Sequence, residues 1–363
     1  MLKLTDYNAT DFTSGISIDE AQDVRVTYEI NGARTLAFTY PKNEKSNYVR
    51  ENKIVICEGQ AYRVMRAVCE RDGREFIRVE CSHVWNADAP NFHIQNLPDM
   101  IGVSPTSVLG AAISGSRFSL FTDSELARLN MTRVDADGFL IDFFSIDKTN
   151  PYDVAKMLIE SCGKGELYAD NYKIALVERI GTDTNVRLDL PKNMRDLTVE
   201  RDITDLITRL YPYGKNDAHI GSVNGGKQYI DSPNISAYGV REGYREYSDI
   251  TEPADLITRA EWEFSDRNAE RIDAPSLSVT GTYADISRLS GYGADEKIGI
   301  GDGVTVIDGT RPIALRVIKI EYDPTGGEST VISVGHVKKD LFFYLRQIGE
   351  ITSRLKKVYR RTT

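Results

Sequence analysis

The chain has 363 residues, of which 41% are hydrophobic and 27% are charged. This composition is typical of a folded protein, and the length is too great for one compact core. Two or more domains are therefore expected. The 45 Lys and Arg residues against 54 Asp and Glu give a formal net charge of -9, which excludes a wholly basic nucleic-acid surface but not a local basic patch.

The first residues lack the apolar stretch of a signal peptide, and no run approaches the roughly 18 apolar residues that cross a bilayer. The sequence therefore predicts a cytoplasmically made product without a membrane span. Its cysteines form no C-x-x-C motif, so neither a zinc site nor a disulfide framework is indicated. We expect buried thiols on strands at Cys57, Cys69, Cys81 and Cys162.

Apolar side chains alternate along residues 24–40 on both sides of Asn31-Gly32. Alternation around an Asn-Gly pair is a strong signal for a β-hairpin. Similar alternation continues through turns at Glu58-Gly59 and Asp72-Gly73 as far as Cys81. Residues 16 to about 90 therefore predict an antiparallel meander, as a small barrel or sandwich.

The pattern changes between residues 95 and 165. Ser104-Pro105 and Asn150-Pro151 each place a capping side chain before a proline, which predicts the start of a helix. The second helix is expected to end at Gly163, a good C-terminal cap. Strands are predicted to resume at residues 173–177 and 186–190.

A second β-rich region is predicted for residues 197–337, interrupted by a helix from Pro253 to about Arg271. Its clearest strand patterns lie at residues 304–306, 315–322 and 331–334, each bounded by Gly or Pro. No sequence repeat relates this region to the first one.

The C-terminal segment carries apolar residues that step by three and four positions, which is a heptad pattern. Isoleucines at successive core positions favour a trimeric coiled coil, and the alternative is one amphipathic helix lying on its own domain. The candidate oligomer-interface residues are Leu341, Tyr344, Ile348, Ile351, Leu355 and Val358.

The last ten residues contain five cations and no acid, so residues 1–353 carry a net charge of -14. A basic end suits the C-terminus of a helix and a solvated tail, with contact to an acidic partner as the alternative. The segments together predict an α+β, mainly β chain with two small antiparallel barrel or sandwich domains. Its parts are a β domain (1–95), an α/β insert (96–196), a second β domain (197–337) and a terminal helix (338–363).

No arrangement of residues predicts a metal or cofactor site. The histidines His83, His93, His219 and His336 are scattered and belong to no zinc motif. Asp135-Ala136-Asp137-Gly138 resembles the start of a calcium loop, but Ile146 occupies the twelfth position and cannot chelate, so a turn is expected. The glycine clusters lack the spacing of dinucleotide or phosphate loops and predict turns.

Cys81 and His83 form the one candidate catalytic dyad. Residues two apart on a strand point to the same face, so a thiol and an imidazole could meet there. Same-face neighbours on a half-buried strand are also ordinary core residues, which is the interpretation we favour. We therefore expect no catalytic residues in this chain.

In the second β-rich region lies the string Thr208-Arg209-Leu210-Tyr211-Pro212-Tyr213-Gly214. With this string the sequence resembles the tail-hub proteins of phages and prophages, also named prophage tail endopeptidase or minor structural proteins. The segments around Glu29–Tyr40, Val79–His83 and Ile300–Val304 occur in the same order in that family. The most specific matching residues are Thr208, Arg209, Leu210, Tyr211, Pro212, Tyr213 and Gly214.

The resemblance implies a homotrimeric ring at the tip of the tail tube, in a phage, prophage or tail-like particle assembled in a bacterial host. Two β domains per subunit would give six similar faces against a hexameric tube. It further implies contacts with the tail tube or distal tail protein and with tip or spike proteins. DNA would be only cargo in the channel, and Tyr211 and Tyr213 are candidate contact residues.

Two alternatives remain at this point. The family name includes "endopeptidase", so a tail-associated peptidase or cell-wall hydrolase acting during infection is the main alternative, with Cys81 and His83 as its candidate residues. A receptor-binding or glycan-binding tip is the third interpretation, supported only by surface tyrosines.

Overall fold

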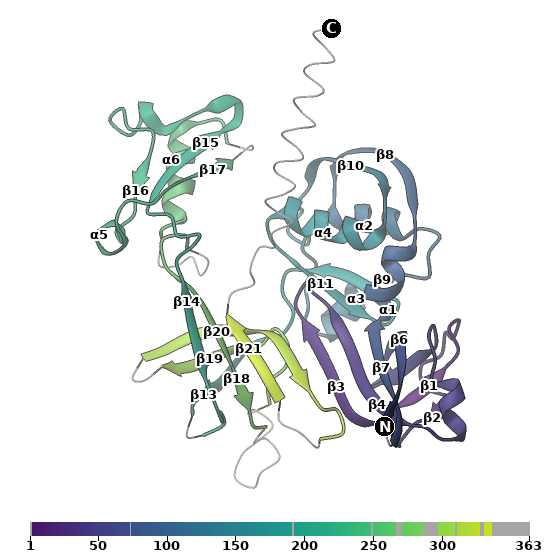
Figure 1. Cartoon of the computed structure of the whole chain (residues 1–363). Coiled ribbons are helices and arrows are strands. Elements are labelled where there is room, and N and C mark those ends of the chain that lie inside the picture. Colours follow the sequence, from purple (N-terminus) through teal and green to yellow (C-terminus); the bar gives the residue numbers. More distant parts are fainter. Residues whose placement is uncertain are drawn as a thin grey trace. The chain divides into compact units, whose positions relative to one another are not determined.

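The structure is a computed structural model that describes residues 2–72, 74–190, 192–247, 250–265, 271–285, 297–308, 311–326 and 330–335. It is mainly β with several helices, as predicted (Figure 1). The chain divides into two compact units, Met1–Leu197 with Thr280–Thr363, and Thr198–Val279. The predicted C-terminal helix, with its heptad positions from Leu341 to Val358, lies outside the described residues, as does His336. The predicted four-part domain boundaries stay a prediction.

The N-terminal part of the first unit is the predicted antiparallel meander. The hairpin around Asn31 is confirmed, and Asn31 adopts the left-handed conformation (φ 56°) that the tight turn requires. Its elements are β1 (Lys3–Thr5), β2 (Ile16–Ser17), β3 (Gln22–Glu29), β4 (Arg34–Pro41), η1 (Glu44–Tyr48), β5 (Ile54–Cys57), β6 (Gln60–Asp72) and β7 (Arg74–His83).

The insert contains the two predicted helices, and both predicted caps are confirmed. The side chains of Ser104 and Asn150 accept hydrogen bonds from the backbone of the first helical turn, and Gly163 ends the second helix at φ 64°. The sequence did not indicate that β8 (Ile94–Val103) and β10 (Ile141–Thr149) form an antiparallel pair of strands. The insert elements are α1 (Val84–Asp88), η2 (Ala89–Asn91), β8 (Ile94–Val103), α2 (Pro105–Ile113), β9 (Ser119–Leu120), α3 (Asp123–Arg128), β10 (Ile141–Thr149), α4 (Pro151–Cys162), β11 (Glu166–Asp170) and β12 (Lys173–Val177).

The last strands of the first unit continue the N-terminal sheet. Strand β20 pairs antiparallel with β3, with Lys319 opposite Glu29 and Tyr322 opposite Val26. The sheet order therefore runs β18-β21-β20-β3-β4-β7-β6-β5-β1-β2, and β19 lies between β20 and β13. The added strands are β13 (Asp183–Leu188), β18 (Ser276–Tyr283), β19 (Gly303–Asp308), β20 (Arg311–Tyr322) and β21 (Thr330–Gly335).

Strands from the two predicted β regions therefore pair in one sheet. No sheet formed by the described residues closes on itself, so the predicted barrels are not confirmed. The N-terminal strands pack around one core, in which Leu36, Phe38, Tyr40 and Val79 are fully or almost fully buried. A second core in the insert lies among α2, α4, β8 and β10.

The second unit contains a three-stranded sheet in the order β16-β15-β17, with β15 and β17 parallel. Helix α6 contributes Leu256 and Ala260 to the core beneath this sheet. The predicted helix from Pro253 to about Arg271 is shorter in the structure. The elements of this unit are β14 (Thr198–Asp202), β15 (Arg209–Gly214), η3 (Lys215–Asp217), η4 (Ile220–Ser222), β16 (Ile230–Asp231), α5 (Ile235–Tyr238), β17 (Glu242–Tyr247) and α6 (Pro253–Trp262).

A buried ion pair joins the insert to β20. The Glu166 side chain is 6% exposed and accepts hydrogen bonds from Arg316, with 2.6 Å between Oε1 and Nη1 and 3.1 Å between Oε2 and Nη2. Glu166 Oε2 also accepts from the backbone N–H of Ile180 at 2.6 Å. Three donors thus compensate a carboxylate that has left water.

We predict that Glu166→Ala lowers the free energy of unfolding by about 3–5 kcal/mol, because Arg316 then stays partly buried without its counter-charge. Urea unfolding followed by tryptophan fluorescence measures the change. Glu178→Ala removes an exposed glutamate nearby and should change stability by less than about 0.5 kcal/mol. Equal stability of the two variants would contradict the importance of the pair.

Candidate functional site

The candidate dyad Cys81 and His83 lies at the end of β7, inside the N-terminal core. His83 is 1% exposed, its Nδ1 accepts from the backbone N–H of Trp85 at 3.3 Å, and its Nε2 lies 3.2 Å from Gln60 Oε1. Since Nδ1 is the acceptor, Nε2 carries the proton and donates to Gln60. Both ring nitrogens are therefore engaged by groups other than the thiol.

Burial also opposes ionisation of both partners. Desolvation raises the pKa of the Cys81 thiol and lowers the pKa of His83 well below its ordinary value. A cysteine nucleophile requires a thiolate beside an imidazolium, and burial at this site disfavours both of these charged forms. The geometry gives the peptidase interpretation no catalytic dyad at these two residues.

Of the other cysteines, only Cys57 is the buried strand thiol that the sequence predicted, because Cys162 is half-buried at the end of helix α4. Cys57 is buried, and desolvation raises its pKa to about 12, while desolvation raises the pKa of Cys162 to about 11. Cys69 is exposed on β6, contrary to the expectation of a buried thiol. The loop at Asp135 is a turn in which this carboxylate accepts from the backbone and hydroxyl of Thr106.

The residues of the family string lie in the second unit, on β15 and just before it. Leu210 and Pro212 point into the core, whereas Arg209, Tyr211 and Tyr213 are partly exposed on the opposite face. Alternation along a strand separates the string into a buried and an open set. The prediction that the two tyrosines anchor another chain stays a prediction.

The open set forms a compact polar and aromatic cluster. Arg209 lies 4.1 Å above the Tyr229 ring and forms an ion pair with Asp231. The Tyr211 ring lies 5.5 Å from that of Tyr229, and its hydroxyl donates to Glu242 at 3.2 Å. The rings are therefore held in place on the partly exposed face of the sheet.

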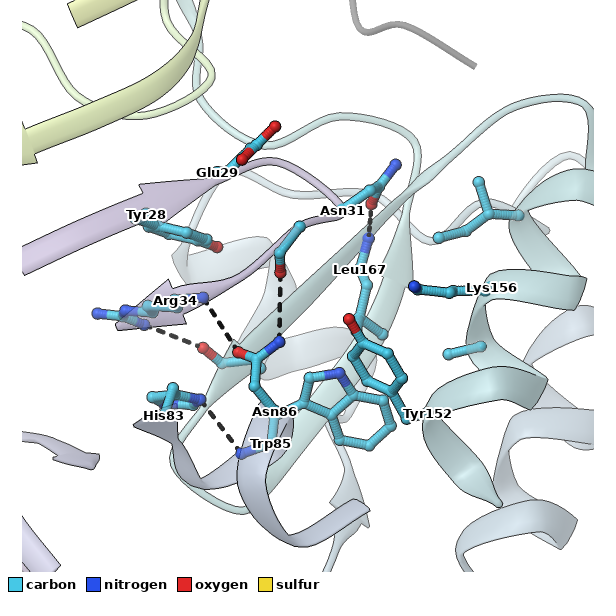
Figure 2. Close-up of a pocket in the computed structure, with 14 residues that line it drawn as sticks. Tyr28, Glu29, Asn31, Arg34, His83, Trp85, Asn86, Tyr152, Lys156 and Leu167 are labelled. Atoms are coloured by element: carbon cyan, nitrogen blue, oxygen red, sulfur yellow. Dashed lines mark hydrogen bonds between the residues drawn. The ribbon is translucent and has the colours of Figure 1, made fainter. Parts of the chain in front are cut away.

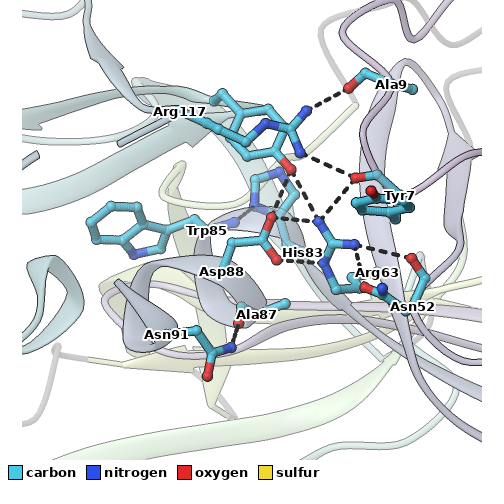
Figure 3. A network of polar contacts seen from close by, with 11 residues as sticks. Tyr7, Ala9, Asn52, Arg63, His83, Trp85, Ala87, Asp88, Asn91 and Arg117 are labelled. Atoms are coloured by element: carbon cyan, nitrogen blue, oxygen red, sulfur yellow. Dashed lines mark hydrogen bonds and ion pairs between the residues drawn. The ribbon is translucent and has the colours of Figure 1, made fainter. Parts of the chain in front are cut away.

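A polar network that the sequence did not indicate fixes the insert to the N-terminal sheet (Figure 3). Arg63 forms a two-point ion pair with Asp88 of α1, and the Tyr172 hydroxyl donates to the same carboxylate at 2.7 Å. Arg117 lies 4.2 Å above the Tyr172 ring and donates to the carbonyls of Tyr7 and Ala9. These residues are far apart in the sequence, and no motif marks them.

Among the described residues, no group of three or more His, Cys, Asp or Glu side chains is placed to hold a metal ion. No helix in the same ranges is long and apolar enough to cross a bilayer.

We predict that iodoacetamide at pH 8 alkylates Cys69 of the native protein first. Cys57, Cys81 and Cys162 should react at least about 100-fold more slowly, because only the thiolate is nucleophilic and burial suppresses it. Peptide mass spectrometry over time measures the four rates, and all four should converge in urea. Fast alkylation of Cys81 in the folded protein would restore the peptidase interpretation.

Two family models match the sequence. The model described as the prophage endopeptidase tail N-terminal domain matches residues 2–83, and the model described as the prophage endopeptidase tail matches residues 182–342. The matches fall on the two strand-rich parts of the chain, and the insert lies between them. A search of curated proteins found no match.

The fold is similar to those of solved tail proteins. Prophage tail protein gp18 from Listeria monocytogenes is 14% identical, with 97% of this chain and 99% of that chain covered and a TM-score of 0.62. The 43 kDa tail protein of prophage MuSo2 from Shewanella oneidensis is 14% identical, with 92% and 97% covered and a TM-score of 0.61. The tail protein from Neisseria meningitidis MC58 is 10% identical, with 92% and 96% covered and a TM-score of 0.57.

At these identities the structural likeness concerns the fold alone, while the two family matches rest on the sequence itself. Their ranges lie in the order expected for one protein and together cover two thirds of its residues. The chain belongs to the prophage endopeptidase tail family.

Proposed function

We propose that this chain is a structural hub protein of a phage, prophage or tail-like particle. Three copies form a ring that joins the tail tube or distal tail protein to the tip or spike and surrounds the channel. The protein is made in the host cytoplasm and acts in the assembled tail. It acts by holding its partner proteins in a fixed arrangement and catalyses no reaction.

The pairing of β3 with β20 is the observation that carries this proposal. It joins the two parts matched by the family models into one sheet, through four residue pairs from Val26–Tyr322 to Glu29–Lys319. A subunit with two sheet segments lets a trimer present six segments to a sixfold tube. A rigid connection between the segments within each subunit suits this role.

We assign the outward face of β3 and β4 to the channel wall. Thr27, Thr35 and Thr39 place short polar side chains there, and each is partly exposed. On the same side of the sheet, Arg25 of β3 lies 4.0 Å from Glu321 of β20, and Arg66 of β6 lies 3.3 Å from Glu80 of β7. Short hydroxyl groups and neutralised arginines give DNA phosphates few cations to bind.

We predict that the protein forms trimers when it is mixed with its tail-tube or distal tail partner. Asp in place of both Ile348 and Ile351 should leave it monomeric, because two charges would enter each heptad core. Native mass spectrometry gives the masses. Ser353→Asp lies off the heptad positions and should retain the trimer.

A wild-type chain that stays monomeric with every tail partner present contradicts the ring. If the doubly substituted variant still forms trimers, the heptad residues are not required for trimer formation. The ring proposal would stand in that case, because the ring can close through other surfaces.

We predict that Glu80→Gln combined with Glu321→Gln increases binding to duplex DNA about tenfold at 50 mM salt, because Arg66 and Arg25 lose their carboxylate partners. Fluorescence anisotropy with a short duplex measures the affinity. The increase should shrink as salt rises. Glu51→Gln combined with Glu178→Gln changes two exposed glutamates off this face and is the matched control for net charge. Equal effects of the two double variants would contradict the assignment of this face.

A further inference from the structure

Strand β17 lies at the edge of the three-stranded sheet in the second unit (Figure 1). Among the described residues, β15 is the one strand that pairs with it, along all six residues from Glu242 to Tyr247. The other side of β17 therefore presents backbone N–H and C=O groups that no described strand satisfies. Such an edge can accept a further strand from another chain through main-chain hydrogen bonds.

One face of this edge strand carries an exposed aromatic ring between two acids. Alternation along β17 places Glu242, Tyr244 and Glu246 on one face, whereas Tyr247 lies on the other face and packs in the core with α6. All three residues of the first face are exposed, and the exposed fraction of Tyr244 is 54%. The open edge is thus bordered by a ring and by carboxylates on the same face.

The same face shows how this sheet holds a cation. The Arg209 guanidinium lies 4.1 Å above the Tyr229 ring and forms an ion pair with Asp231. Stacking of this kind also occurs in the first unit, where the Arg34 guanidinium lies 4.7 Å from the centre of the Tyr28 ring (Figure 2). A planar guanidinium suits both contacts, because it stacks on a ring while its N–H groups point at carboxylates.

At the edge, the ring and the carboxylate are present without a cation. The centres of the Tyr213 and Tyr244 rings lie 6.4 Å apart, and Glu246 is opposite Tyr213 in the strand register. Glu246 forms no ion pair with a residue that the structure describes, whereas Glu242 lies 3.7 Å from Arg209. The edge therefore carries an uncompensated negative charge beside an exposed ring, which is complementary to a cation.

We propose that β17 binds an extended segment of a partner protein as a fourth strand, with an arginine of that segment stacked on Tyr244 and paired with Glu246. The residues next to this arginine point to the other face of the sheet. They are neutral or acidic, because the half-buried Arg245 lies on that face. The site uses no contact of the proposed ring, so its test does not depend on the proposed function.

The probe is a short fluorescent peptide of alternating arginine and threonine, mixed with the full chain. Fluorescence anisotropy should show saturable binding that weakens as salt rises. Hydrogen–deuterium exchange of residues 242–247 should slow by at least about tenfold at saturation, because the outward N–H groups of β17 gain acceptors. The same peptide methylated on every backbone nitrogen keeps its charges but cannot pair as a strand, and it should bind at least about tenfold more weakly.

Variants of the protein separate this site from general attraction to an acidic chain. Tyr244→Ala should weaken binding of the peptide about tenfold, and Glu246→Gln about fivefold. The matched controls are Tyr238→Ala, which removes a partly exposed tyrosine of α5, and Glu261→Gln, which changes an exposed glutamate of α6. Both controls should bind as the wild type does.

Glu246→Gln provides the decisive comparison if Tyr244→Ala fails to fold, because it keeps the size of an exposed side chain. The proposal is overturned if the wild-type chain shows no saturable binding of the peptide, or if Glu246→Gln and Glu261→Gln bind it equally well. Binding that leaves the exchange of residues 242–247 unchanged overturns it as well, because the peptide would then lie elsewhere.

Discussion

The pairing of β3 with β20 is the constraint on which the first unit depends, because it joins residues from opposite ends of the chain. Beyond the four paired positions, the Ile30 N–H donates to the Ile318 carbonyl at 3.0 Å. Closing so long a loop is entropically unfavourable, although the cost grows only slowly with length. The insert and the second unit both lie within this loop. The pairing of β3 with β20 therefore sets the order of strands in the sheet, and it does not restrict the segments of chain between the two strands.

Charged groups taken out of water tie the insert to that sheet. Asp88 meets Arg63, Glu166 meets Arg316, and each carboxylate also has a further donor. Buried pairs add little stability relative to apolar residues of the same size, but a mispaired charge is strongly unfavourable. These ion pairs therefore chiefly select one arrangement of the insert on the sheet, because another arrangement would leave a buried charge without its partner. Arg34 is the exception, since its partners are neutral.

Local patterns in the sequence predicted local structure well. Asn31-Gly32 specified a hairpin, and Ser104-Pro105 specified a helix start, because their side chains act on backbone only a few residues away. Strand β8 was missed because Pro98 and Gly102 interrupt its alternation, although β10 pairs with it along its length. The join of β20 to β3 and the Arg63–Asp88 contact were not predictable, since each depends on residues distant in the sequence.

The family string shows how a sequence can be specific without being catalytic. Thr208 is fully buried, and its hydroxyl donates to the Gly239 carbonyl while accepting from the Arg241 N–H. A Cβ at Gly214 would lie 2.5 Å from the Ile250 carbonyl oxygen, so only glycine fits. Packing thus accounts for both ends of the string. The half-exposed residues between them are arranged by ring contacts and ion pairs, which makes the string a requirement of the fold and of its exposed surface.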